Sequence, residues 1–393
     1  MKVVLSTWGR FHFFHLARQF EKRGVLERIF TTYPMFKLRD EGLPAGRIQS
    51  DAVIGTFLLG KARFGLQYPP LDRPLQHLMV DVHDRYMQRR MPPCDVFIAL
   101  SGSGQVIGAE VQKNGGAYIC ERGSSHIAWG DDMMAEEFER WGLTPVRTSQ
   151  RYIDREEVEY RQCDRLVVPS NFVKRSFVER GVSADKIEVN GYGADLGRFQ
   201  KVAEPPVDQF VVLFVGGVRF RKGIPYLLEA FRRFEHPNKV LKIIGAVLSE
   251  IRDYLSTAPL DGVEFLGIVP NSELPTHMSR AHAMVLPSLE EGMALVQAEA
   301  LACGCPVIAT RNTGGEDLFD DGQQGFLGPI RDPQFIADRL QLLADDPALR
   351  ERLSHSAQQR LLTIGGWDQY GERYMDICRA VMGKAALTAV NQA

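Results

Sequence analysis

Short apolar runs of strand length alternate along the chain with longer amphipathic segments of helix length. This alternation is typical of an α/β protein, in which a crossover helix connects each strand to the next parallel strand. The chain opens with an expected strand at 2–6, a glycine turn at Trp8-Gly9-Arg10 and an amphipathic helix that stops at Gly24, as in a Rossmann-like unit. The other strands expected in the first half are 28–32, 95–100, 117–120 and 165–169.

The pattern restarts after 203–208, a segment with the composition of a linker. Six apolar residues at 210–215 predict a strand that is covered on both faces. Further strands are expected at 241–244, 263–266, 283–286 and 306–309, and the tail from Gly365 predicts a final helix that packs back on the first domain. We therefore expect two doubly wound, Rossmann-like α/β domains that face each other across a cleft, at 1–205 and 206–365, followed by a C-terminal helix at 366–393.

Composition and charge narrow the class of protein. The chain has 393 residues, of which 45% are apolar, and its net charge of -2 gives no reason to expect a nucleic-acid partner. The N-terminus lacks the apolar core of a signal peptide, and no stretch approaches the length of a membrane span. Six scattered cysteines fit reduced thiols, and the close pair Cys303 and Cys305 has no second Cys/His pair that would complete a zinc site. The expected location is the cytoplasm.

The stretch 59–90 is more basic than the rest of the chain, and two interpretations of it stay open. In the first interpretation, the charged groups face solvent while the aliphatic parts of the same side chains are buried. In the second, the cations contact anionic lipid or an anionic acceptor, which would place the protein peripherally at the inner face of the membrane. The basic residues are Lys61, Arg63, Arg73, Arg85, Arg89 and Arg90.

The stretch 287–302 has the pattern of a ligand site. It starts at the carboxyl end of an expected strand, crosses a loop with Gly292 and enters a helix rich in alanine and leucine. Ligands bind at this edge of open parallel sheets, and the first amides of a helix have no intrahelical acceptor and favour an anion such as a diphosphate. Glu291 and Glu299 are either ordinary helix-face glutamates or acceptors for sugar and ribose hydroxyls. The amides concerned are those of Ala294, Leu295 and Val296.

A second loop follows the strand at 210–215 and reads Gly216-Gly217-Val218-Arg219-Phe220-Arg221-Lys222-Gly223. Glycines let the backbone approach a ligand, and the three cations supply positive charge beside it. A nucleoside diphosphate gains negative charge as it departs, so a fixed cation stabilises the transition state more than the ground state. Alone, this loop could be a basic turn without a ligand. Two such loops at one edge of a sheet favour a common site.

These loops resemble those of retaining glycosyltransferase family four, whose members have the GT-B fold. The E-x7-E pattern from Glu291 to Glu299 resembles the hallmark of that family, and Arg221-Lys222-Gly223 resembles its basic loop. Gly191-Tyr192-Gly193-Ala194-Asp195 with Phe199 resembles its interdomain segment, and 312–317 resembles its later glycine turn. The resemblance covers about 166–328 and is weaker in the first domain.

The resemblance implies a metal-independent, retaining transfer of a hexose-type sugar from a nucleotide diphosphate sugar to a glycan or lipid-linked acceptor, in surface polysaccharide biosynthesis. It implies that Lys222 holds the diphosphate, that Glu291 binds hydroxyls of the donor sugar and that Glu299 binds the ribose. It also implies a first-domain histidine that faces the donor sugar, and His126 is the best match. The donor-binding residues that it implies are Gly9, Arg10, Gly216, Gly217, Arg219, Arg221, Gly292, Met293, Ala294, Leu295, Val296 and Glu299.

Two positions depart from the family pattern. Gly217 stands where the family has an arginine, so Arg219 or Arg221 would supply the second cation, and the N-terminal glycine pair is reduced to Gly9 followed by Arg10. No Asp-x-Asp pair occurs in the chain, so we expect no metal and no other cofactor. Front-face attack is the implied route, because the sequence offers no candidate carboxylate nucleophile.

Other functions stay open on the sequence alone. A sugar-nucleotide epimerase or a phosphorylase can share the scaffold, and a sugar-nucleotide-binding protein without catalysis could keep the same loops. An NAD(P)-dependent oxidoreductase is a further alternative, because Gly102, Gly104 and Gly108 follow an expected strand and Glu121 lies about 20 residues on. Their spacing is G-x-G-x-x-x-G, and no partner for hydride transfer is evident.

Overall fold

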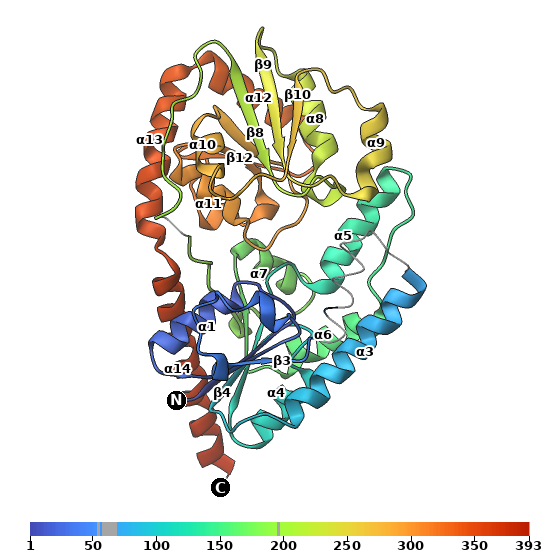
Figure 1. Ribbon diagram of the computed structural model, residues 1–393, viewed down its shortest axis with the longest axis vertical. Coiled ribbons are helices and arrows are strands. Elements are labelled where there is room, and N and C mark those ends of the chain that lie inside the picture. Colours follow the sequence, from blue (N-terminus) through green and yellow to red (C-terminus); the bar gives the residue numbers. More distant parts are fainter. Residues whose placement is uncertain (53–55, 57–68, 195–196, 393) are drawn as a thin grey trace.

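The computed structural model describes residues 1–52, 56, 69–194 and 197–392, and it contains two parallel β-sheets (Figure 1). The first sheet has seven strands in the order β3-β2-β1-β4-β5-β6-β7, and the second has six in the order β10-β9-β8-β11-β12-β13. Every strand pair in the described residues is parallel. The predicted α/β fold with two Rossmann-like units is therefore confirmed.

The first sheet and its helices come from the N-terminal half of the chain. Its elements are β1 (Val3–Thr7), α1 (Phe13–Lys22), β2 (Leu26–Thr31), β3 (Ile48–Ser50), α3 (Pro69–Gln88), β4 (Val96–Leu100), α4 (Gln105–Lys113), β5 (Ala117–Glu121), α5 (Ile127–Arg140), α6 (Gln150–Gln162), β6 (Arg165–Val168), α7 (Asn171–Val178) and β7 (Ile187–Val189).

The second sheet and its helices follow, and the last helix returns to the first sheet. The elements are β8 (Phe210–Val215), η4 (Phe220–Lys222), α8 (Ile224–Arg233), β9 (Lys239–Ile244), η5 (Ser249–Ile251), α9 (Arg252–Thr257), β10 (Val263–Gly267), α10 (Leu274–Ser279), β11 (Ala283–Leu286), α11 (Leu295–Ala302), β12 (Val307–Thr310), η7 (Gly315–Asp317), β13 (Gly325–Gly328), α12 (Pro333–Asp345), α13 (Pro347–Ile364) and α14 (Trp367–Gln392).

All ten strands expected from the sequence are present, with ends displaced by at most two residues. Three strands were missed, namely β3, β7 and β13. Each lies at an edge of its sheet, has only three or four residues and contains no three consecutive apolar residues, whereas the four-residue strands that were expected do. Their pairing is decided by the neighbouring strand rather than by their own composition.

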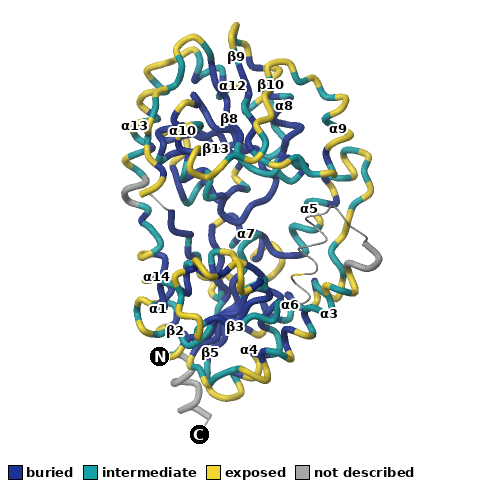
Figure 2. Tube along the Cα trace, in the orientation of Figure 1, coloured by how far each residue is buried: buried dark blue, intermediate teal, exposed yellow. Residues whose placement is uncertain are grey.

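The core of each domain lies around its central strands, where the buried residues concentrate (Figure 2). All five residues of β1 are buried, as are the first five of β8, because helices cover both faces of a parallel sheet. The helices that follow these strands are amphipathic and bury one face: α1 buries Leu16 and Phe20, and α8 buries Leu227 and Phe231. Burial of one such side chain contributes about 1.5–3 kcal/mol.

In each sheet, successive strands are added first on one side and then on the other. The order changes direction between β1 and β4 in the first sheet and between β8 and β11 in the second. The connections on the two sides of such a point run to opposite faces, so the loops at the carboxyl ends separate and leave room for a ligand. The loops after β8 and β11 are the two that the sequence analysis selected. Since β8 and β11 are paired strands, these loops start side by side.

The C-terminal helix α14 packs on α1 and β5 of the first domain, and Figure 1 shows it running alongside that domain in red. Tyr370 and Tyr374 of this helix are completely buried. Its first turn lies against the interdomain segment at Gly193, where the backbone of Gly366 and Trp367 leaves no room for a side chain.

Part of the basic stretch can be placed. Arg73, Arg85, Arg89 and Arg90 are exposed on α3 or just after it, whereas Lys61 and Arg63 lie outside the described residues, as does Asp195 of the interdomain segment. Among the helices in the described part of the chain, none combines the length and the apolar character that crossing a membrane requires.

We predict that Gly193→Ala lowers the stability of the protein by about 1–3 kcal/mol, because a backbone neighbour cannot move aside for the new methyl group. A Cβ at this position would lie 2.4 Å from the Trp367 nitrogen. The midpoint of thermal unfolding measures the effect. Gly46→Ala is the matched control, since a Cβ at Gly46 meets nothing within 4 Å. Equal midpoints for the two variants would contradict the prediction.

Candidate interdomain site

The loops after β8 and β11 converge on one place. The Leu289 amide donates a hydrogen bond to the Arg221 carbonyl at 2.9 Å, which ties the two loops together through their backbones. Gly223 has a φ of 68°, and a Cβ there would lie 2.0 Å from the Pro287 carbonyl oxygen. Only glycine therefore fits at the point where the basic loop crosses the end of β11.

This convergence brings cations and carboxylates of the two loops into contact. Lys222 Nζ lies 2.5 Å from Glu291 Oε1, and an Arg221 guanidinium nitrogen lies 3.5 Å from Glu291 Oε2. Lys222 and Glu291 are 14% and 10% exposed, so their charges interact in a largely desolvated place. Glu291 Oε1 is itself buried, and Lys222 is the cation that faces it.

The first domain contacts the loop after β11 through hydrogen bonds and a close backbone approach. The Ser125 amide donates to Glu290 Oε1 at 2.9 Å, and the Ser170 hydroxyl donates to the Gly292 carbonyl at 2.6 Å. A Cβ on Gly292 would lie 1.8 Å from the Gly123 carbonyl oxygen. The chain between Glu290 and Gly292 is therefore held by both domains.

Glu290 is a functional candidate that sequence reasoning missed. Its buried carboxylate accepts hydrogen bonds from the Ser125 amide and from Arg221, the second at 3.1 Å. Burial would by itself raise the pKa of Glu290, but the Arg221 charge and the Ser125 N–H outweigh it, and the pKa is lowered. Glu290 thus stays ionised and connects the basic loop to the first domain. The only sign in the sequence is that Glu290 directly precedes Glu291.

His126 makes its side-chain contacts within the first domain. This residue caps α5: its Nδ1 accepts the Ala128 amide at 3.2 Å, and its ring packs on Tyr160 and Phe177. Burial, together with the positive charges of Arg180 and Arg122, lowers the pKa of His126 to about 4. His126 is therefore a neutral, buried residue of the first domain, and its place opposite the donor sugar stays a prediction.

Two of the predicted cations are engaged elsewhere. Arg10 pairs with Glu41, and Glu41 also binds Arg18 at 2.6 Å. The partner of Arg10 therefore belongs to the first domain. Arg219 lies 3.4 Å from Glu250 on η5. The second cation beside Lys222 is therefore Arg221, one of the two alternatives that the sequence left open.

One of the three predicted helix amides is not available for an anion. The Ala294 amide donates to the Thr313 carbonyl at 3.1 Å, because Ala294 is the N-cap of α11 and lies against the turn before η7. Leu295 and Val296 form the exposed side of the first helical turn and are half-buried, and Glu299 is half-buried one turn further on.

The remaining predicted residues make backbone and apolar contacts. Gly216 lies against the Lys222 side chain, and Gly217 lies near Leu248. Met293 packs against Gly191 of the interdomain segment, while Gly9 is buried at the end of β1.

The glycine loop that suggested an oxidoreductase is closed by the protein itself. The buried carboxylate of Glu159 accepts the amides of Gly102, Gly104 and Gln105 at 2.7, 3.0 and 2.8 Å. In a dinucleotide-binding loop such amides face the pyrophosphate. Here a side chain occupies that position, and the loop has a structural role.

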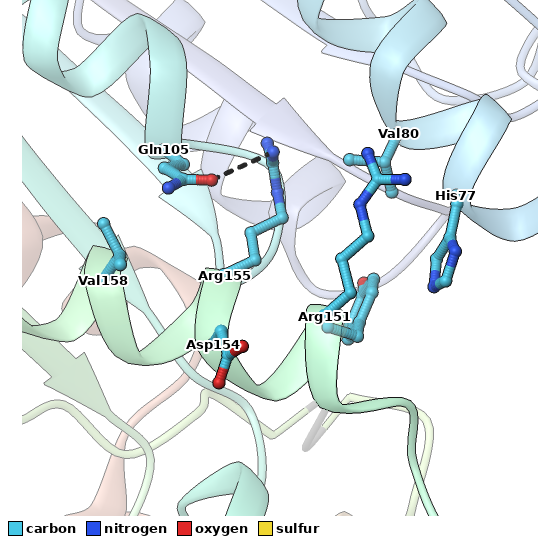
Figure 3. A pocket seen from close by; sticks show the side chains of 8 residues that line it. His77, Val80, Gln105, Arg151, Asp154, Arg155 and Val158 are labelled. Carbon is cyan, nitrogen blue, oxygen red and sulfur yellow. Dashed lines mark hydrogen bonds between the residues drawn. The ribbon is translucent and has the colours of Figure 1, made fainter.

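A pocket of about 400 Å³ lies between α3, α4 and α6 of the first domain (Figure 3). It contains two arginines, Arg151 and Arg155, which pair with Asp81 and Asp84. The side chains that line it include none of the predicted site residues. No cluster of three or more potential metal ligands occurs among the described residues.

Comparison with known proteins places the second domain in a family. Residues 197–360 match the family described as glycosyl transferases group 1. Glycogen synthase of Mycobacterium tuberculosis is 29% identical over 214 residues, which are 53% of this chain and 52% of that protein. The chain spans about half the length of the curated relatives that it matches best.

Solved structures extend the likeness to both domains. Sucrose-phosphate synthase of Thermosynechococcus elongatus superposes with a TM-score of 0.72 at 21% identity, over 98% of this chain and 100% of that one. HepE of Anabaena, solved in complex with UDP-glucose, superposes with a TM-score of 0.67 at 18% identity, over 97% and 100%. Residues 197–360 therefore belong to the group 1 glycosyltransferases, and the chain as a whole has the GT-B fold.

Proposed function

We propose that this protein transfers a hexose-type sugar from a nucleoside diphosphate sugar to a hydroxyl of a glycan or glycolipid, in surface polysaccharide assembly. The observation that carries the proposal is the contact between Lys222 and Glu291 on two adjoining loops at the strand-order reversal of the second sheet. Membership of residues 197–360 in the group 1 family supports it, as does the likeness to a protein that was solved with UDP-glucose.

The cations suit the leaving group. When the glycosidic bond to the donor breaks, the diphosphate gains negative charge, and Lys222 with Arg221 can stabilise it. Both cations are already fixed by Glu290 and Glu291, so little reorganisation is needed at the moment of reaction. In this proposal the two side chains do the work that a divalent metal does in other transferases, and the reaction needs no metal.

The carboxylates suit the sugar. A carboxylate accepts hydrogen bonds from hydroxyl groups, and Glu291 stands beside the two cations that would hold the diphosphate, so in this proposal a hydroxyl of the donor sugar donates to it. Glu299 lies on α11, about one turn after the helix begins at Leu295, and we place the ribose there. The relatives named as synthases of glycogen and of sucrose phosphate support a saccharide acceptor.

The proposed stereochemical course is retention by attack on the face that the diphosphate leaves. The acceptor oxygen bonds to the anomeric carbon, the bond from that carbon to the phosphate oxygen breaks, and the departing phosphate takes the acceptor proton. Glu291, the carboxylate at the site, is paired with Lys222 at 2.5 Å, which favours a binding role over that of a nucleophile.

We predict that Lys222→Ala lowers turnover by about 10²–10³-fold, by analogy with the removal of one fixed oxyanion donor. Release of UDP from UDP-glucose, followed in the presence of a panel of saccharide acceptors, is the measurement. Lys242→Ala is the control, since Lys242 is a partly exposed cation of the same domain that pairs with Glu264. Full activity of Lys222→Ala would refute the proposed clamp, and release of UDP-sugar epimers instead of UDP would indicate an epimerase.

We predict that Glu290→Gln lowers stability by about 1–3 kcal/mol at pH 7, because it removes the charge from a hydrogen bond to Arg221. Since the folded-state pKa of Glu290 is lowered, its stabilising contribution is complete above the ordinary glutamate pKa of about 4.3 and disappears as the pH falls through the lower folded value. The difference in thermal midpoint between the wild type and the variant should therefore shrink below about pH 4.

The exposed Glu351 on α13 serves as the matched control for Glu290. Glu351→Gln should leave the thermal midpoint within about 1 °C of the wild type at every pH, as surface substitutions usually do. A difference between wild type and Glu290→Gln that stays constant from pH 7 to pH 3 would show that the charge of Glu290 is not what holds the domains together.

A further inference from the structure

Helix α5 of the first domain reaches across to the second domain (Figure 1). Its first half is held by the first domain, where the Trp129 indole N–H donates to Glu179 at 2.7 Å. Asp132, on the same half, pairs with Arg180 at 2.6 Å. Its last turn contacts the second domain instead, at η4 and at Tyr226 of α8. One helix therefore connects the two domains.

The contact with the second domain is centred on Glu137, a completely buried carboxylate of α5. Arg331, in the loop between β13 and α12, donates from Nε to Glu137 Oε2 at 2.8 Å. The Tyr226 hydroxyl and the Trp141 indole N–H donate to Oε1 at 2.8 and 2.7 Å. Both oxygens are thus satisfied, and two of the three donors belong to the second domain. Loss of one partner from such a pair leaves an uncompensated buried charge, which is strongly unfavourable.

The backbone of Arg331 is strained at this contact. Its φ of 60° is the only positive one at a non-glycine residue in the part of the chain that the structure describes. Such a conformation is unfavourable for a residue with a Cβ and persists only where the surroundings fix it. The side chain supplies that fixation, because its guanidinium also lies 2.7 Å from Glu136 Oε1 and 3.6 Å from Met133 Sδ. All of these partners are on α5 of the other domain.

Both donors from the second domain keep their protons. Burial raises the pKa of Tyr226, and the hydrogen bond to Glu137 raises it further. Burial would lower the pKa of Arg331, but the hydrogen bond and the charge of Glu137 outweigh it, and the pKa is raised. The hydroxyl and the guanidinium therefore both remain donors to Glu137 at neutral pH.

Two aromatic rings at the end of α5 pack against the basic loop. The rings of Phe138 and Trp141 lie on Phe220, with centroids 5.7 and 6.0 Å away. Phe220 is buried and is the first residue of η4, the short turn that ends at Lys222. The Gly223 amide donates to the Phe220 carbonyl at 2.8 Å and closes this turn. A closed turn of three residues moves as a unit, so the place of Lys222 depends on where the two rings hold Phe220.

We propose that Glu137 is a positioning residue for the reaction. With Arg331 and Tyr226 it holds the end of α5 against η4, and it thereby places Lys222 beside the diphosphate of the donor. The inference rests on the proposed function, since Lys222 has that role only there. In it, the first domain acts on the basic loop without touching the substrate, and the loop takes its working position only while α5 is bound to the second domain.

The kinetic test is a double-mutant cycle between Glu137→Gln and Lys222→Ala. Glu137→Gln alone should lower turnover about tenfold to a hundredfold, as a displacement of about 1 Å at a reacting centre does. If Glu137 acts through Lys222, the double variant should match Lys222→Ala within about twofold. Glu139→Gln is the matched control and should keep the wild-type turnover, because Glu139 is exposed on the same turn of α5. A double variant that loses the product of the two single losses, or full turnover of Glu137→Gln, overturns the proposal.

The position of Lys222 is also measured without any assay of activity. Acetic anhydride acetylates accessible amines, and peptide mass spectrometry of the full chain gives the rate at each lysine. Lys222 is 14% exposed and paired with Glu291, so it should react slowly in the wild type and in Glu139→Gln and severalfold faster in Glu137→Gln. Lys242 of the same domain, which pairs with Glu264, is the internal reference and should keep its rate. An equal rate at Lys222 in all three proteins overturns the positioning role.

A milder variant covers the case in which Glu137→Gln does not fold. Tyr226→Phe removes one donor and leaves Arg331 on Glu137, so it should change turnover and the acetylation of Lys222 in the same directions by smaller factors. A folded Tyr226→Phe protein with wild-type values of both quantities would then overturn the proposal.

The two levels of inference fail separately. If UDP and UDP-glucose do not stabilise the wild type and Lys222→Ala behaves like it, the proposed function is wrong, and the acetylation rate still decides whether Glu137 fixes the place of Lys222. If the wild type transfers sugar and Glu137→Gln does so at the same rate, the assignment of Glu137 is wrong while the proposed function stands.

Discussion

The contact of two backbones, Gly292 in the second domain and Gly123 in the first, is the constraint on which the interdomain site depends. No side chain fits at Gly292, since a Cβ there would lie 1.8 Å from the Gly123 carbonyl oxygen. Glu290 is held on one side of this contact by Ser125 of the first domain and by Arg221 of the second. The catalytic carboxylate proposed here, Glu291, stands between these two fixed residues, so its position is set by the approach of the domains.

The electrostatic arrangement follows from that geometry. Lys222 and Arg221 lie against two largely buried carboxylates, and each pair is neutral overall before a ligand binds. A cation that is already desolvated and held in place loses little on meeting a diphosphate, and this is the condition under which fixed charges stabilise a transition state. Arg219 and Arg10 pair with other carboxylates, Glu250 and Glu41, and not with Glu290 or Glu291.

The C-terminal helix joins the two ends of the chain in the first domain. Tyr370 and Tyr374 cross from α14 to Glu121 at the carboxyl end of β5, and Glu121 binds His12 just before α1. Residues at the two ends of the chain are thereby joined at the edge of the first sheet. A helix that packs back over another domain therefore stabilises that domain and can also align its polar groups.

The sequence by itself determined the α/β fold, ten of the thirteen strands and the two ligand-facing loops of the second domain, because apolar periodicity and glycine-rich strand ends are local properties. Only the tertiary structure decided which polar groups are free and which are engaged. The spacing after β5 favoured His126 as a residue that faces the donor sugar, and the fold buries that ring beside Tyr160. The amide of Ala294 is likewise engaged by Thr313. Such outcomes depend on partners from distant segments, and local patterns do not contain them.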